Sequence, residues 1–405
     1  MSEPLIVIGN GMAAARLVEE LAQRALGRYA VAVIGAEPRL AYNRVLLSAL
    51  LAEEVAIADI ELKPARWWRD RGVTLHYGER ATSVDPAARK VTLASGTELP
   101  FCKLVFATGS QPIKLGNPGM DLTGVSTFRD IDDVRVIAAS KVEGRRVVVI
   151  GGGLLGLEAA CGLAKAGARV TVLHLMDRLM ERQLDPSAAA MLKRELEARG
   201  ITVRLEAETA RIVGKDCVAG VELRDGTMLA ADAVVVAVGT RPNVELARRA
   251  GLAVGRGIVV DDHLESSIAG VHAIGECAEH RALCYGLVEP AYEQARVLAR
   301  RLAGENAAYP GSVLATNLKV SGVGVFSAGE FLGGRAGAEE IVLSDPGVGV
   351  YKKLTIASDH LIGAVLFGDT ADGSWYLDLI RSGSPIAALR DHLVFGRALA
   401  TGAAA

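Results

Sequence analysis

Two segments of this sequence repeat one pattern, and the repeat limits the folds open to the chain. Each is a β-branched apolar run, then a glycine-rich turn, then a segment with the apolar spacing of a helix. They read LIVIGNGMAAARLVEEL from Leu5 and VVVIGGGLLGLEAACGLAKAG from Val147. The two turns are Gly9-x-Gly11-x-x-Ala14 and Gly151-x-Gly153-x-x-Gly156.

The spacing within each turn has a physical reason. The first glycine permits the tight turn, the second lets a pyrophosphate approach the backbone, and the third position must be small so that helix and strand can pack. The N-terminus of the helix then faces the anionic phosphate. One such turn is weak evidence, but two copies in the same strand–turn–helix context predict two bound dinucleotides.

Three further apolar strands fit this organisation. LVFATGSQP (104–112) and VVVAVGTRPN (234–243) each end in a glycine turn followed by proline, and the strand in VHAIGECAEH (271–280) ends at Gly275-Glu276. Each of the first two can close a nucleotide-binding unit and return the chain to the other. In this order the segments predict an α/β fold in which one dinucleotide-binding domain is inserted into another.

Composition excludes several other classes of protein. Of the 405 residues, 50% are hydrophobic and 23% are charged, and no apolar run reaches the roughly 18 residues needed to span a bilayer. The formal net charge of −2 gives no general attraction to nucleic acid. The start, MSEPLIVIGNG, reads as a first strand and not as a signal peptide. We therefore expect a cytoplasmic protein with no nucleic-acid or membrane partner.

The cysteines form no recognisable redox or metal motif. None of them makes a C-x-x-C pair, and no spacing suits a zinc site, an iron–sulfur cluster or a redox disulfide of the CxxxxC type. We expect buried or incidental thiols in a reducing compartment, so that redox chemistry has to come from a bound cofactor. The cysteines are Cys102, Cys161, Cys217, Cys277 and Cys284.

Taken together, these motifs resemble the flavoprotein reductases that bind FAD in one domain and NAD(P)H in a second domain inserted into it. The resemblance implies two Rossmann-like domains and a C-terminal α/β domain that covers the flavin and contacts a partner or a second copy of the chain. It places the FAD-binding domain at 1–113 and 240–312, the NAD(P)H-binding domain at 114–239 and the C-terminal interface domain at 313–405.

The same resemblance assigns site residues. Glu158, just inside the second helix, matches a family carboxylate close to the nicotinamide and is the candidate catalytic residue. The residues implied to hold FAD are Gly9, Gly11, Ala14, Thr108, Gly109, Gly275 and Glu276, and those implied to hold the pyrophosphate of NAD(P)H are Gly151, Gly153 and Gly156. Further cofactor contacts are expected at Met12, Ala13, Glu37, Pro38, Arg44, Ala81, Arg129, Leu154, Leu155, His174, Arg178 and Gly239.

Longer phrases narrow the resemblance. EPRLAYNRVLLS, GGGLLGLEAA, LMERQLD, AIGECAEH and GDTADGSWYLDLIRSG are similar to the flavoprotein portion of assimilatory NAD(P)H nitrite reductase large subunits and to the electron-transfer subunits of assimilatory nitrate reductases. Rubredoxin and ferredoxin reductases of the same fold typically read YDRPPLSK where this chain reads YNRVLLSA, so Ala49 replaces the lysine that approaches the flavin. Arg44 is retained.

The resemblance implies that NAD(P)H delivers a hydride to FAD and that electrons then pass to a partner protein. The implied partner is an iron–sulfur, nitrate reductase or nitrite reductase component. Because the sequence has no cluster cysteines, we expect a free-standing flavin module that does not reduce nitrite alone. The acceptor, the choice between NADH and NADPH and the oligomeric state are left open.

His174 stands where a dinucleotide-binding unit usually carries an acid for the ribose 2′-hydroxyl. A neutral histidine can still bond a hydroxyl, and a protonated one, with Arg178 nearby, could tolerate a phosphate. We therefore expect an altered site with a relaxed preference for NADH. At the first site Ala36 and Glu37 compete for the ribose position, and we favour Glu37 because it carries the carboxylate.

Three other functions compete with this hypothesis. A rubredoxin or ferredoxin reductase of another pathway shares every cofactor motif and differs only in its acceptor. An NAD(P)H oxidase would use oxygen as acceptor, and the absence of a redox-active cysteine in the N-terminal half weakens it. A degenerate redox-sensing module should have lost its glycines or its terminal acid, and the sequence retains both.

Overall fold

The structure divides into two compact units. The first comprises Met1–Ile113 and Thr240–Ser312, and the second comprises Lys114–Gly239 and Val313–Ala405. The computed structural model of the chain describes residues 2–25, 27–140, 142–320 and 322–402. The second unit therefore contains both the segment predicted to bind NAD(P)H and the segment predicted as a C-terminal domain.

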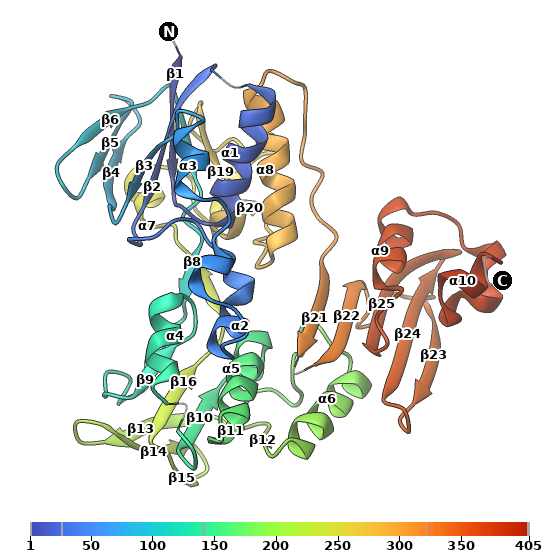
Figure 1. Ribbon diagram of the computed structural model, residues 1–405. Coiled ribbons are helices and arrows are strands. Elements are labelled where there is room, and N and C mark those ends of the chain that lie inside the picture. Colours follow the sequence, from blue (N-terminus) through green and yellow to red (C-terminus); the bar gives the residue numbers. More distant parts are fainter. Residues whose placement is uncertain (1, 26, 141, 321, 403–405) are drawn as a thin grey trace. The chain divides into compact units, whose positions relative to one another are not determined.

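A five-stranded parallel sheet forms the centre of the first unit (Figure 1). Its central strand carries the run Leu5–Ile8, whose residues are at most 5% exposed. A strand that is covered on both faces reads as a continuous apolar run, which explains the LIVI of the sequence. In sheet order the strands are β19 (Val271–Ala273), β7 (Lys103–Phe106), β1 (Glu3–Ile8), β2 (Tyr29–Gly35) and β3 (Thr74–Tyr77).

Two helices of the first unit, α1 (Met12–Arg24) and α8 (Val288–Leu302), lie side by side (Figure 1). The buried face of α1 includes Ala14, Leu17, Val18 and Leu21, which have the spacing of one helical stripe. The other elements of this unit are η1 (Arg44–Leu46), α2 (Leu47–Leu51), η2 (Ile57–Ile60), α3 (Ala65–Arg69), β4 (Ala81–Asp85), β5 (Lys90–Leu93), β6 (Glu98–Pro100), β8 (Ser110–Pro112), β17 (Thr240–Pro242), α7 (Glu245–Arg249), β18 (Ile258–Val260), η3 (Gly275–Cys277) and β20 (Ala278–His280).

The second unit repeats the parallel-sheet design. Its five strands lie in the order β12 (Thr202–Arg204), β11 (Arg169–Leu173), β10 (Arg146–Ile150), β16 (Ala233–Val236) and β9 (Val125–Thr127). All four neighbouring pairs are parallel. The accompanying elements are α4 (Ile131–Ala138), α5 (Leu154–Lys165), α6 (Pro186–Ala198) and an antiparallel sheet of β13 (Thr209–Gly214), β14 (Val218–Leu223) and β15 (Met228–Ala230).

The C-terminal part of the second unit is an antiparallel sheet with α9 packed against β22 and β25. The buried Tyr376 of α9 donates its hydroxyl to Leu393 O at 2.7 Å, which ties the helix to the segment that follows it. The strands, in sheet order, are β21 (Ala315–Val320), β22 (Val323–Gly329), β25 (His360–Gly368), β24 (Val350–Ala357) and β23 (Glu339–Asp345), and the helices are α9 (Gly373–Ser382), η4 (Ala387–Phe395) and α10 (Arg397–Ala400).

Asp185 joins the two parts of the second unit. Its carboxylate accepts the N–H of Ala188 at 3.1 Å and so caps α6. The same side chain, 4% exposed, accepts the Tyr351 hydroxyl at 2.7 Å and lies 3.4 Å from the Lys353 ammonium, both from β24. A buried carboxylate is stable only with such partners, so this cluster fixes α6 against the C-terminal sheet.

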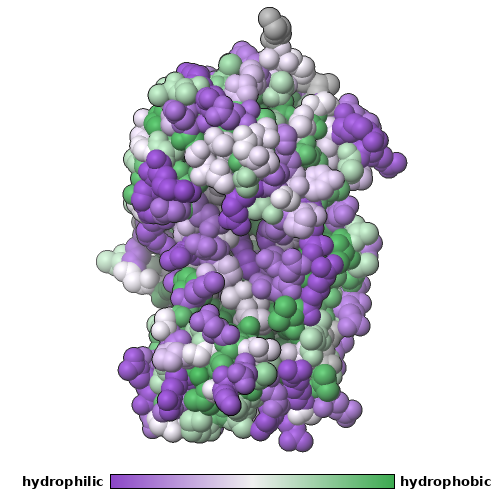
Figure 2. All heavy atoms as spheres, turned by 90° about the vertical axis from the view of Figure 1, so that its left-hand side faces the viewer, coloured by the Kyte–Doolittle hydropathy of each residue, from purple (hydrophilic) through white to green (hydrophobic). Residues whose placement is uncertain are grey.

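The exposed side chains include both hydrophilic and apolar residues, as expected from a composition that is half hydrophobic. On the face shown in Figure 2, hydrophilic side chains are interspersed with apolar ones. Across the described part of the chain, no helix combines the length and the apolar character that a membrane crossing requires. Two parallel sheets, each flanked by helices, and a C-terminal mixed domain confirm the predicted α/β class.

Candidate functional site

The first glycine turn joins β1 to α1. Gly9 has φ +118°, and its N–H donates to Ile34 O of β2 at 2.8 Å. A Cβ on Gly9 would lie 2.0 Å from Ala107 O, so no larger residue fits. Around Gly11, by contrast, no heavy atom of the described residues lies within 4 Å of a built Cβ, which leaves the turn open on the side where α1 begins.

The second glycine turn, between β10 and α5, has the same geometry. Gly151 has φ +122°, its N–H donates to Leu173 O at 2.8 Å, and a Cβ there would lie 2.3 Å from Ala237 O. A Cβ on Gly153 would again meet no described atom within 4 Å. At Gly156 a Cβ would lie 2.0 Å from Gly151 O, so this helix requires glycine at the third position.

Both turns meet the steric and polar needs of a pyrophosphate. α1 and α5 begin at Gly11 and Gly153, and no described side chain caps either helix. Neither helix has an acid in its first turn. The free N–H groups of the first turn therefore face the open side of each glycine loop, where they and the helix dipole favour an anion. The predicted contacts Met12, Ala13, Leu154 and Leu155 occupy these first turns.

The strand that follows the first turn is succeeded by a carboxylate whose position is fixed by its neighbours. Glu37 follows β2, and its Oε2 accepts the Tyr42 hydroxyl at 2.7 Å. Arg44 pairs with the other oxygen, Oε1, and its guanidinium lies over the Tyr42 ring, 4.9 Å from the centroid. Glu37 remains 35% exposed at its side chain, so the carboxylate is fixed in direction but open to a ligand. Pro38 lies beside Gly78, and Ala81 begins β4.

The remaining FAD candidates of the first unit lie close together. The Glu276 carboxylate accepts the Ser110 hydroxyl at 2.7 Å, next to Gly109. Gly275, at φ +79°, donates its N–H to the Gln294 side chain of α8 at 2.7 Å. Gln294 is fully buried, and its Nε2 has no hydrogen-bond partner among the residues described. The structure thus places the turn at Gly275 and Glu276 against β8 and α8.

Thr108 is held by a residue that sequence reasoning did not assign to the site. Its hydroxyl donates to Asn243 O at 2.7 Å, and the Asn243 side chain returns a hydrogen bond to Thr108 O at 2.9 Å. Asn243, Gln294 and Ser110 are the polar groups that the motifs missed. Gln294 had a usable signal, because it is a polar residue on the apolar face of an amphipathic helix.

The strand after the second turn ends in His174, which is 8% exposed. The neighbouring Arg178 donates to Asp177 at 3.0 Å. Glu158 is half-buried in α5, and Gly239 has φ +107° just after β16. Arg129 donates its backbone N–H to Asp133 at 2.7 Å, before α4. These predicted residues all lie within the second unit, on the loops and the helix that follow the carboxyl ends of β9, β10, β11 and β16.

The Cys277 thiol, next to the third predicted strand end, is held in its unreactive form. Cys277 is fully buried, and burial raises the pKa of its thiol, which favours the unreactive protonated form. None of the five cysteines, all of which the structure describes, forms a disulfide. Among the residues described there is also no group of three or more His, Cys, Asp or Glu side chains arranged to hold a metal ion.

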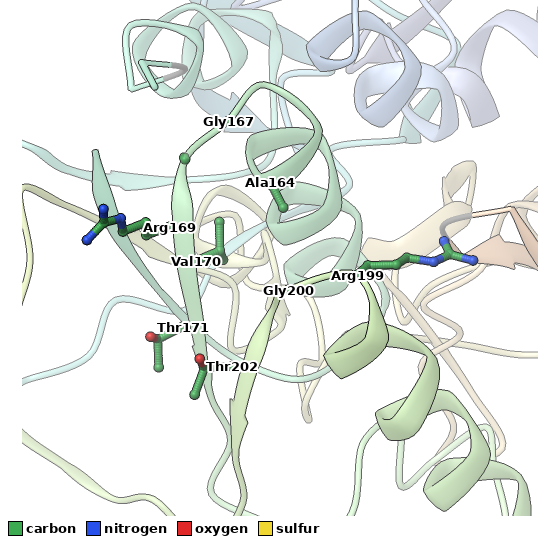
Figure 3. A pocket seen from close by; sticks show the side chains of 9 residues that line it. Ala164, Gly167, Arg169, Val170, Thr171, Arg199, Gly200 and Thr202 are labelled. Carbon is green, nitrogen blue, oxygen red and sulfur yellow. The ribbon is translucent and has the colours of Figure 1, made fainter. Parts of the chain in front are cut away.

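A cavity of about 460 Å³ lies elsewhere in the second unit (Figure 3). It is bordered by Ala164 near the end of α5, by Gly167 just after that helix, by Arg169 at the start of β11 and by Thr202 at the start of β12. These are the amino ends of the strands, whereas the glycine turn follows a carboxyl end. In open α/β sheets ligands bind at the carboxyl ends, so we do not assign this cavity to the nucleotide.

Comparison with known proteins identifies the class. Residues 3–297 match the family model described as pyridine nucleotide-disulphide oxidoreductase, and residues 315–384 match the rubredoxin NAD+ reductase C-terminal domain. The chain belongs to the pyridine nucleotide-disulphide oxidoreductase family. It is an FAD-dependent NAD(P)H oxidoreductase of that family, and the predicted family resemblance and cofactors, FAD and NAD(P)H, are confirmed.

Individual relatives agree with the phrases quoted above. The chain is 44% identical to nitrite reductase [NAD(P)H] of Bacillus subtilis over 94% of its length, and 40% identical to the assimilatory nitrate reductase electron transfer subunit of the same organism over 92%. It covers 48% of each of these proteins, or about half. Among solved structures, a ferredoxin reductase from Rhodopseudomonas palustris superposes with a TM-score of 0.86 at 28% identity, covering 95% of this chain and 98% of that one.

Proposed function

We propose that this chain accepts a hydride from NAD(P)H and passes the electrons to a partner redox protein in nitrate or nitrite assimilation. The observation that carries the proposal is the pair of glycine turns, which have closely similar geometry and lie one in each unit. The likeness to a nitrite reductase and to a nitrate reductase electron transfer subunit supports the pathway.

In this proposal the first unit is the FAD-binding domain. Gly9, Gly11 and the first turn of α1 bind the pyrophosphate, and Glu37, oriented by Tyr42 and Arg44, binds a ribose hydroxyl. Glu276, held by Ser110, binds the ribityl chain. When bound, FAD supplies the redox chemistry that the side chains lack, because it takes up two electrons together and releases them singly.

Residues 114–239 form the NAD(P)H-binding domain in this proposal. Gly151, Gly153 and Gly156 bind the pyrophosphate at the start of α5, and Glu158 orients the nicotinamide. These residues position the reactants and exclude water; they carry no nucleophile or proton relay. Residues 313–405 form the interface domain for the electron-acceptor protein, and a homodimer through the same domain is part of the proposal.

An anaerobic titration tests this proposal. Purified protein is titrated with NADH and then with NADPH while the visible absorbance of the flavin is followed. We expect a yellow protein whose flavin is bleached stoichiometrically by at least one of the two donors. A colourless protein, or a flavin that neither nucleotide bleaches, would contradict the proposal.

One observation favours a second candidate function. Residues 315–384 match the rubredoxin NAD+ reductase C-terminal domain, which is consistent with rubredoxin or ferredoxin as the acceptor. Rates of electron transfer from the reduced protein to rubredoxin, to ferredoxin and to a nitrate or nitrite reductase component distinguish the two. The main proposal requires the last acceptor to react fastest.

A further inference from the structure

The strand end that ordinarily carries the ribose-binding acid has a buried histidine in this chain. The Nδ1 atom of His174 accepts the backbone N–H of Gly152, in the glycine turn itself, at 3.0 Å. Its Nε2 lies 3.1 Å from Oε2 of Glu181. Because Nδ1 is an acceptor, the proton of the neutral ring is on Nε2 and is donated to the Glu181 carboxylate. Both ring nitrogens are therefore engaged by the protein.

Glu181 is brought to this point by a segment tied to the same glycine turn. Met180 has φ +50°, and its N–H donates to Gly152 O at 3.0 Å. The N–H groups of Gln183 and Leu184 both return to Met180 O at 2.8 Å, which closes a tight turn around Glu181. Met180 and Leu179, at 0% and 1% exposure, anchor that turn in the core.

The middle glycine of the turn makes room for this arrangement. A Cβ on Gly152 would lie 2.7 Å from Cγ of His174 and 2.6 Å from Cδ2 of Leu179. The corresponding position of the first turn is Asn10, which has a side chain. The middle glycine of the GGG sequence, Gly152, is therefore explained by the inward histidine, and not by the pyrophosphate.

Glu181 keeps part of its carboxylate available. Its side chain is 24% exposed, and within the described part of the chain the only charged group paired with its Oε1 is the highly exposed Arg182, at 3.9 Å. Arg178, the cation expected to attract a 2′-phosphate, is bonded to Asp177 at 3.0 Å. A carboxylate at the end of the second strand accepts hydrogen bonds from ribose hydroxyls and repels a phosphate.

We infer that Glu181 is the residue that accepts a hydrogen bond from the adenosine ribose 2′-hydroxyl of NADH and repels the 2′-phosphate of NADPH. His174 is its positioning residue and does not contact the nucleotide. The inference rests on the proposed binding of NAD(P)H at the second glycine turn. It makes the chain selective for NADH although the strand end itself carries no acid.

Calorimetric titration of the FAD-loaded chain with ADP-ribose and with 2′-phospho-ADP-ribose tests this inference without any electron transfer. The wild-type protein should bind ADP-ribose at least about tenfold more tightly, since a charged hydrogen bond is lost and a repulsion gained with the phosphate. Glu181→Gln should weaken ADP-ribose by about tenfold and bring the ratio of the two dissociation constants close to one.

Three variants control the experiment. Glu195→Gln removes a carboxylate that pairs with Arg199 on α6, away from His174, and should leave the ratio unchanged. His174→Ala should reduce the ratio in the same direction as Glu181→Gln, and His174→Gln, which can both accept and donate a hydrogen bond, should restore part of it. Thermal melts of each variant verify that the chain is folded.

The outcomes separate the inference from the proposal beneath it. If the wild-type chain binds neither ligand, the nucleotide site of the proposed function is absent and both fail. If ADP-ribose binds but folded Glu181→Gln keeps the wild-type ratio, the inference alone is overturned. A preference of the wild type for the 2′-phosphorylated ligand would also overturn it.

Discussion

The two glycine turns have nearly the same backbone, but the side chains at the end of the strand that follows each turn are different. At both, the first glycine has a positive φ, donates to the end of the neighbouring strand at 2.8 Å and leaves no room for a Cβ beside a carbonyl. The side chains at the two strand ends are different. At the first, Glu37 is a partly exposed carboxylate held by Tyr42 and Arg44, whereas at the second, His174 turns inward and Glu181 arrives from further along the chain.

This difference separates two kinds of constraint. The turn is fixed by packing that any pyrophosphate-binding unit must satisfy, so it recurs almost unchanged. In the proposed sites the residues after each strand end face the part of the dinucleotide that differs between ligands. Their side chains can therefore change as long as a suitable polar group is presented.

The largest effects are expected from Gly9→Ala and Gly151→Ala. Each adds a Cβ at 2.0 Å or 2.3 Å from a backbone carbonyl and at a positive φ. We expect each to lower the free energy of unfolding by more than about 3 kcal/mol, since backbone atoms cannot move aside as a side chain can. Gly9→Ala should lose FAD, and Gly151→Ala should keep FAD but lose bleaching by NAD(P)H.

Two matched controls isolate the contribution of the clash. Gly27 and Gly200 have φ of +86° and +81°, and a Cβ at either would meet no described atom within 4 Å. Gly27→Ala and Gly200→Ala should therefore cost only about 1 to 2 kcal/mol, the penalty of the left-handed conformation alone. Chemical denaturation and flavin absorbance measure both sets, and equal losses in all four variants would refute the packing argument.

Substitutions at the third position of the two turns should lower the stability of the protein by different amounts. Gly156→Ala places a Cβ 2.0 Å from Gly151 O and should cost about 2 to 3 kcal/mol. At the equivalent position of the first turn the chain already has alanine, so Ala14→Gly only removes a buried methyl in a helix, at about 1 kcal/mol. Denaturant unfolding of the two variants measures the difference, and a tolerant Gly156→Ala would show that the second turn is looser than its geometry indicates.

A pH effect is expected from His272, one of the buried histidines of the first unit. His174, in the second unit, has both ring nitrogens bonded, but His272 has no hydrogen-bond partner for either nitrogen within the part of the chain that is described. Burial lowers the pKa of His272 from 6.5 to about 4. The unfolded chain therefore takes up a proton between these values while the folded chain stays neutral, so stability falls as the pH falls from 6.5 towards 4.

The size of this effect follows from the pKa difference. Between pH 7 and pH 5 the histidine should remove about 2 kcal/mol from the free energy of unfolding, and above pH 7 it should contribute no slope. His272→Leu should flatten this part of the pH profile. Urea unfolding at several pH values gives the measurement, and an unchanged slope in His272→Leu would assign the acid sensitivity to other groups.

The sequence predicted best those features that a local steric requirement fixes, because such a requirement limits which residue can stand at a given position. Gly9 and Gly151 can be recognised in the sequence because a positive φ next to a backbone carbonyl excludes residues with a side chain. Strand β1 can be recognised because a strand that is covered on both faces has a continuous apolar run, here LIVI. The fold class followed from these patterns, the family and the two cofactors followed from the resemblance, and all three are confirmed. The assignment of individual site residues and the domain boundaries remain predictions.

The groups that were missed are those placed by distant contacts. Asn243 reaches Thr108 across 135 positions, and Tyr351 reaches Asp185 across 166. Neither pair has a spacing rule, because the partners meet only after the strands between them are arranged. The sequence marks His174 as unusual at this strand end, but the direction of its side chain could not be derived from the strand that carries it.

The sequence by itself determined that this chain has two strand–glycine–helix units, since their requirements act over a few neighbouring residues and appear as fixed spacings. Only the tertiary structure decided which carboxylate faces the end of β11. That outcome depends on the positive φ of Met180 and on its bond to Gly152 O, which turn Glu181 back towards His174. No local pattern marks such a turn, because a non-glycine residue takes up a left-handed conformation only when surrounding contacts hold it there.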